Sequence, residues 1–109
     1  MIEIAVPDKI QIGGFWFNVV CSPEEDVYLK ERGWWGRYSE AEQICSVRSD
    51  TNPQLMSATL IEEISHAIEV VYAGHHIDHQ DLKDLAAGWF QVLEGLGVRL
   101  SFIKYHLHR

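Results

Sequence analysis

Cysteines, basic residues and long apolar runs are all scarce in this sequence. Its two cysteines, Cys21 and Cys45, are too few for a disulfide scaffold, so we expect two buried free thiols. The sequence does not open with basic residues followed by an apolar run, and we therefore expect no secretion signal. No apolar stretch is long enough to span a bilayer. These absences predict a cytoplasmic protein with no membrane partner.

The charge balance is acidic, with sixteen Asp and Glu against nine Lys and Arg and a formal net charge of −7. A nucleic-acid-binding surface needs clustered Lys and Arg to neutralise phosphates, so the composition argues against nucleic acid as a partner. The negative charge permits a metal ion or a cationic partner. Solubility alone is the commoner reason for such a charge.

The first half of the chain has the pattern of strands. The chain is long enough for one domain, and its hydrophobic fraction of 47% supports a buried core. Gly13 and Gly14 separate two apolar runs, which is typical of a hairpin because the favoured two-residue turns need positive φ. Residues 22–32 are charged, and their pattern is compatible with either a loop or a short helix. We expect a small antiparallel sheet of three to four strands, from the runs at 10–12, 15–20, 34–38 and 43–47.

The second half has the pattern of two helices, over residues 52–74 and 78–97. Asn52 is a suitable N-cap for the first helix, and Asp78 for the second. Each helix has an apolar stripe at helical spacing. Residues 98–109 alternate loosely, and we expect them to add a strand or to pack as an arm. The pattern predicts an α+β fold of one domain, with the sheet packed on two main helices.

One segment of the first predicted helix carries candidate chemistry, the run Glu62-Glu63-Ile64-Ser65-His66. Zinc peptidases of the zincin type use H-E-x-x-H on a helix, where both histidines bind the metal and the glutamate activates a metal-bound water. This sequence keeps the frame but has a glutamate in the place of the first histidine. At about 100° per residue, Glu62 and His66 project close together, and Glu63 projects between them and the apolar stripe. We therefore expect Glu63 at the edge of the core, near the sheet.

Longer stretches around this segment resemble one family. The run TLIEEISHAIEVVY is similar to the TLLHEILHAI helix of small metallopeptidase-like proteins of phages and mobile elements, which are minimal relatives of the ImmA/IrrE group. The run LKDLAAGWFQVL resembles their second helix, and the KIQIGG hairpin and the WWGRYSEAEQICSV strands are also similar. The resemblance covers nearly the whole chain. It implies a minimal zincin fold, a location in the host cytoplasm, and a peptide or protein partner.

The resemblance also implies roles for residues of the first predicted helix. It gives Glu63 the role of general base and His66 that of a metal ligand, and it places Glu62 where the family has its first histidine. Glu62 and His66 together with an acidic third ligand would still bind zinc, and Mn²⁺ would compete well because two carboxylates make a harder site. The chain would then be a weak metal-dependent peptidase, in which a peptide lies extended along an open sheet edge.

The third ligand in related peptidases is an acidic residue near the start of the second helix. Asp81 and Asp84 are the chemically sensible candidates in this sequence. Two other positions stay open. His79 lies about one turn earlier, and Lys83 falls where many phage members have a glutamate.

A second outcome is that the metal is lost and that the chain is an inactive relative serving as a protein-binding or regulatory module. Glu62 and Glu63 would then crowd the place of a cation, and their repulsion would raise a carboxylate pKa unless a basic group neutralised it. Lys83 and Arg37 are candidates for that group. In particular, Lys83 could form an ion pair with Glu62.

Simpler interpretations exist for these and other polar residues. The glutamates, Glu69 included, fit a solvated helix face. His75, His76 and His79 can bind metal together, but a polar loop is the simpler interpretation. His106 and His108 fit an exposed tail.

Trp34 and Trp35 come just before a predicted strand. We expect one of them to pack in the core. The other, beside Arg37, would suit a surface that binds a partner, because aromatic residues and Arg dominate such anchors.

Overall fold

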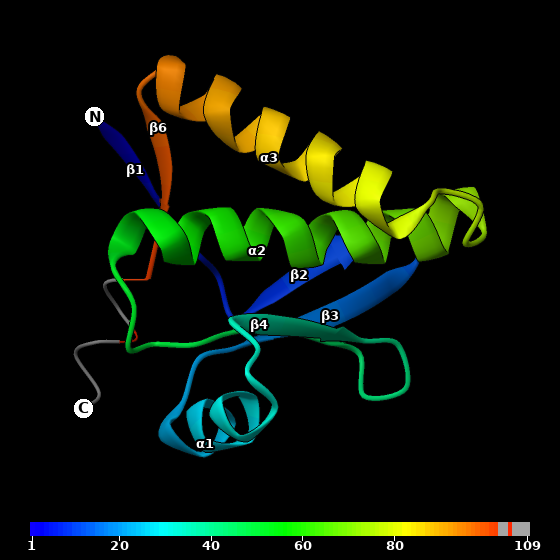
Figure 1. The fold of residues 1–109 in the computed structure, drawn as a ribbon, viewed down its shortest axis with the longest axis horizontal. Coiled ribbons are helices and arrows are strands. Elements are labelled where there is room, and N and C mark those ends of the chain that lie inside the picture. Colours follow the sequence, from blue (N-terminus) through cyan, green and yellow to red (C-terminus); the bar gives the residue numbers. More distant parts are fainter. Residues whose placement is uncertain (103–104, 106–109) are drawn as a thin grey trace.

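The computed structural model describes residues 1–102 and residue 105. These residues form three α-helices, one π-helical segment and six strands, and they confirm the predicted α+β fold. Figure 1 shows the layers: α2 (Pro53–Ile68) lies in the middle, with a four-stranded sheet on one side and α3 (His79–Gly95) on the other. Helix α1 (Pro23–Arg32) lies beyond the sheet.

The four-stranded sheet has the order β2-β3-β5-β4. Gly13, at φ 62°, makes the turn of the β2–β3 hairpin, as the two glycines predict. β4 and β5 also pair antiparallel, whereas β3 and β5 pair parallel because α1 carries the chain across between them. The sheet is therefore mixed rather than purely antiparallel. Its strands are β2 (Lys9–Ile12), β3 (Phe15–Val20), β4 (Gly36–Ser39) and β5 (Ile44–Val47).

The charged segment 22–32, for which the sequence is compatible with either a loop or a helix, forms helix α1. The hydroxyl of Ser22 accepts a hydrogen bond from the N–H of Glu25 at 3.2 Å, and Gly33 ends the helix at φ 71°. The carboxylate of Glu25 accepts a hydrogen bond of 2.7 Å from Nε of Arg37 on β4. This hydrogen bond joins α1 to β4.

Helix α2 confirms the first predicted helix. The Oδ1 of Asn52 accepts a hydrogen bond from the N–H of Leu55 at 2.8 Å, so Asn52 is the N-cap, as predicted. The π-helical segment η1 (Glu69–Ala73) follows without a break, and Gly74 at φ 63° ends it.

Helix α3 confirms the second predicted helix, and Asp78 caps it by accepting a hydrogen bond from the N–H of Gln80 at 3.0 Å. Strand β6 (Val98–Ser101) follows. Of the two expectations for the tail, an added strand and a packed arm, the structure thus has the strand. It pairs in parallel with β1 (Ile2–Ala5), a strand that the sequence pattern did not predict. His106 and His108 lie outside the described residues.

The main core lies between the four-stranded sheet and the inner face of α2, and its buried side chains include Phe17, Cys45 and Leu60. Cys45 is buried and Cys21 is half-buried, and no disulfide joins them. Trp34 and Trp35 are both about half exposed, so the expectation that one of them packs in the core is wrong. Their loop, between α1 and β4, runs along the surface instead, where the guanidinium of Arg48 lies 4.5 Å from the ring of Trp35.

Candidate functional site

A cavity of about 680 Å³ opens between α2, α3 and the chain that leads into β4. We call it the α2–α3 cavity. The polar side chains of the zincin-like frame line it together: Glu62, Glu63 and His66 come from α2, and His79 and Lys83 come from α3. The close placement expected for residues 62, 63 and 66 from helical spacing is therefore found in the structure.

Glu63 is the most buried of these groups, with 6% of its surface exposed. Gly36 of β4 lies directly over it, because a Cβ atom on Gly36 would be 3.4 Å from Cγ of Glu63 and only 2.5 Å from the carbonyl oxygen of Ser46. Burial, and then the nearby charge of Glu62, raise the pKa of Glu63 to about 8. Glu63 is therefore mostly protonated at neutral pH and can donate a hydrogen bond.

His66 and His79 meet across the two helices. Their rings stack with centroids 5.2 Å apart and an interplanar angle of 21°. Burial of His66 and the proximity of His79 lower the pKa of the His66 imidazole, against the smaller opposite effects of Glu62 and Glu69. His66 is thus largely neutral at pH 7.

The two basic groups expected to neutralise the glutamates behave differently. Arg37 is part of the cavity lining, but its guanidinium is engaged elsewhere, because it donates hydrogen bonds of 2.7 Å to both Glu25 and Glu42. Lys83 does line the α2–α3 cavity. Among the described residues, however, no ion pair within 4.0 Å joins it to Glu62 or Glu63. The structure does not form the ion pair that the sequence suggested.

Asp81 and Asp84, the candidates for a third ligand, lie away from Glu62 and His66. Both line a separate, open groove on the outer side of α3, and Asp84 accepts a hydrogen bond of 2.9 Å from the side chain of Gln80. The helical repeat explains this placement, since His79 and Lys83, four residues apart, share the face of α3 that turns to α2. The acidic candidates are therefore on a different face from the cavity.

The donor set does not fit a bound zinc or manganese ion. A zinc site needs at least three protein ligands that converge on one point. Within residues 1–102 and 105, no three His, Cys, Asp or Glu side chains are placed so that they could hold one metal ion. Lys83 adds a positive charge to the lining of the same cavity.

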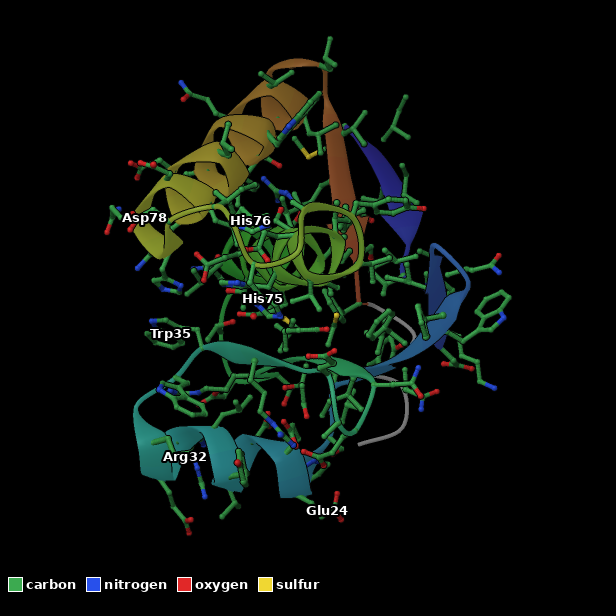
Figure 2. The ribbon with its side chains drawn as sticks, turned by 90° about the vertical axis from the view of Figure 1, so that its right-hand side faces the viewer. Glu24, Arg32, Trp35, His75, His76 and Asp78 are labelled. Carbon is green, nitrogen blue, oxygen red and sulfur yellow. The ribbon has the colours of Figure 1, made fainter. Side chains whose placement is uncertain are left out.

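The histidines of the loop before α3 do not act as one cluster. Figure 2 shows His75 and His76 on the turn that follows η1. Nδ1 of His75 lies 3.8 Å from a carboxylate oxygen of Glu69, whereas His79 alone reaches the α2–α3 cavity. Glu69 is as buried as Glu63. The simpler expectation, that these glutamates lie on a solvated helix face, is therefore wrong for Glu63 and Glu69.

Sequence analysis expected Glu63 near the sheet and one exposed tryptophan beside Arg37, but it did not place β4 and the loop before it in the wall of this cavity. Six consecutive residues, 33–38, line the α2–α3 cavity, including both Trp34 and Trp35. Trp35 is labelled in Figure 2, on the loop that leads into β4. The two adjacent tryptophans were the only signal in the sequence that could have indicated this wall.

Neither a family model, nor a curated protein, nor a solved structure matches this chain. Among the helices of the described residues, none combines the length and the apolar character that a membrane span requires.

Proposed function

We propose that this chain is a zincin-like domain that has lost metal catalysis and binds an extended peptide segment of a partner protein in the α2–α3 cavity. The observation that carries the proposal is the set of polar side chains that line this cavity. Its carboxylates and imidazoles stand next to Lys83 and beside the outer edge of β4, not around a point where a metal could bind.

The edge of β4 supports binding of an extended peptide. β4 is the last strand of its sheet and pairs with β5 on one side. The carbonyl of Trp35 accepts a hydrogen bond from the N–H of Arg48 at 2.9 Å. In an antiparallel pair such bonds fall on alternate residues, so Gly36 and Tyr38 turn their N–H and C=O groups away from β5. A peptide strand added at this edge would pair with those groups.

The electrostatics of the cavity also favour a neutral polypeptide over a metal ion. Glu63 is mostly protonated at neutral pH, because burial raises its pKa to about 8, and the lowered pKa of His66 keeps that ring neutral. Neutral donors and acceptors lose less hydration on binding than charged ones do. Exposed Trp34 and Trp35 at the mouth offer the large, rigid apolar surface that dominates peptide recognition.

Peptide selection tests the proposed binding directly. Short peptides selected from a displayed library on the full chain are titrated as free peptides into the protein by calorimetry. We expect Trp35→Ala to weaken binding about tenfold or more. The matched control is Trp16→Ala, since Trp16 is similarly exposed but lies on β3, outside the cavity lining. Equal loss in both variants, or none in either, contradicts the proposal.

Metal analysis tests the other half of the proposal. The protein is purified without a chelator and without a histidine tag, loaded with zinc or with manganese, and dialysed. We expect no stoichiometric metal. About one equivalent of metal that disappears in His66→Ala would overturn the proposal in favour of a metal-dependent peptidase. Glu62 and His66 in one cavity are the observation that favours that alternative.

A further inference from the structure

Helix α3 carries a row of apolar side chains that face away from the rest of the described protein. Each of the four is more than half exposed, which is unusual for large apolar residues on one helix face. We call this row the α3 stripe. It consists of Leu85, Trp89, Val92 and Leu96.

The spacing of the α3 stripe is that of a helix–helix seam. Its members follow one another at intervals of four, three and four residues, the a/d repeat by which one helix packs along another. The inner face of α3 already uses other residues, because Leu82 and Ala86 are buried. The apolar sector of α3 is therefore wider than its packing on α2 requires.

Two glycines lie beside the stripe, and no contact among the described residues explains them. Gly88 lies inside α3 and Gly95 is its last residue, and a Cβ atom on either would meet no atom of the described residues within 4 Å. Glycine destabilises a helix interior relative to alanine. Neither close packing nor a left-handed backbone requires it at these positions. A second helix that approaches this flank closely would account for both.

We propose that two copies of this chain associate through their α3 stripes, in antiparallel orientation about a two-fold axis. In that arrangement Trp89 faces Val92 of the second copy, and Leu85 faces Leu96 of the second copy. The two-fold symmetry repeats both pairs, so that every member of the stripe gains an apolar neighbour. The stripe is thus complementary to itself.

The exposed area is of the size that a weak dimer buries. The four side chains present on the order of 400 Å² of apolar surface, which is within the range of the largest apolar patch on a monomer, a patch that is often a binding site. Ile2 lies near the end of the stripe, because its N–H donates a hydrogen bond of 2.6 Å to the carbonyl of Gly97, next to Leu96, and its side chain is also exposed. Two stripes with their polar flanks bury on the order of 1,000 Å² in total, which is the size of a weak, concentration-dependent interface.

Sedimentation of the full chain between about 1 and 200 μM tests the dimer. We expect a concentration-dependent monomer–dimer equilibrium. Val92→Glu should raise the dissociation constant at least about tenfold, because it places two carboxylates in the apolar seam. The matched control is Val27→Glu on α1, since Val27 is 56% exposed and Val92 is 51% exposed. That variant should leave the dimer unchanged.

A second variant separates loss of dimer from loss of folding. Gly88→Leu introduces no charge, and it improves the helical propensity of α3. We expect a higher melting temperature of the monomer together with a weaker dimer. A chain that stays monomeric at every concentration, or a dimer equally weakened by the change at Val27, overturns the inference. The α3 stripe lies outside the α2–α3 cavity, so either proposal can fail without the other.

Discussion

The ionisation of Glu63 gives the sharpest quantitative prediction. Its pKa rises from an ordinary 4.5 to about 8 in the folded protein. Between these values the unfolded chain has released the proton while the folded protein still holds it. Stability is therefore fully present below about pH 4.5 and is lost as the pH rises toward 8. The difference between these two pKa values corresponds to a loss on the order of 5 kcal/mol.

Glu63→Gln removes that loss, because glutamine has a similar shape and cannot ionise. We expect urea denaturation to give nearly equal free energies of unfolding for both proteins at about pH 4. At about pH 9 the variant should be more stable by on the order of 5 kcal/mol. Glu62→Gln is the companion variant. It removes the neighbouring charge that contributes to the shift, so the pH dependence of the otherwise native protein should become shallower.

A stability gain that is the same at both pH values would refute the reasoning. So would a variant that is less stable than the native protein at pH 9, because that result would mean that a cation already neutralises the Glu63 carboxylate. Repeating the pH 9 measurement with a chelator, and again with Lys83→Met, would then show whether the cation is a metal ion or the lysine ammonium.

Three further substitutions test how the cavity is held in place. Gly36→Ala should destabilise the protein by about 1–3 kcal/mol in thermal unfolding, because the new Cβ would lie 2.5 Å from the carbonyl oxygen of Ser46 on β5 and 2.6 Å from Cγ2 of Thr59 on α2. A neutral result would mean that Gly36 lies farther from both. Asn52→Ala removes the N-cap of α2 and should lower the free energy of unfolding in urea by about 1 kcal/mol, whereas no change would contradict the cap. Arg37→Met leaves the buried carboxylate of Glu25 without its guanidinium partner, and we expect a loss of about 1–3 kcal/mol that shrinks when the pH falls below 4, since Arg37 holds the pKa of Glu25 below its usual value. A loss independent of pH would contradict this role.

Much of the candidate site on α2 could be predicted from the sequence. Helical spacing alone places Glu62 and His66 together, and the apolar stripe places Glu63 at the edge of the core. The structure has all three in the lining of one cavity, with Glu63 buried. These relations lie within one helix, where a fixed rotation per residue decides which side chains are neighbours.

The contribution of α3 could not be predicted in the same way. The sequence offered Asp81, Lys83, Asp84 and His79 for one position, and the structure places Lys83 and His79 in the cavity and the two aspartates on the outer face. Neighbouring residues on a helix differ by about 100° in direction, so only the packing of α3 against α2 decides which of them points inward.

The sequence by itself determined the local features of this protein: the glycine turn after β2, the caps at Asn52 and Asp78, and the two helices with their apolar stripes. Each depends on residues a few positions apart, whose steric and hydrogen-bonding preferences act in any context. Tertiary structure alone decided the parallel pairing of β3 with β5 and the closure of β4 over Glu63. The raised pKa of Glu63 depends on that closure, because desolvation requires atoms from several distant segments to exclude water together.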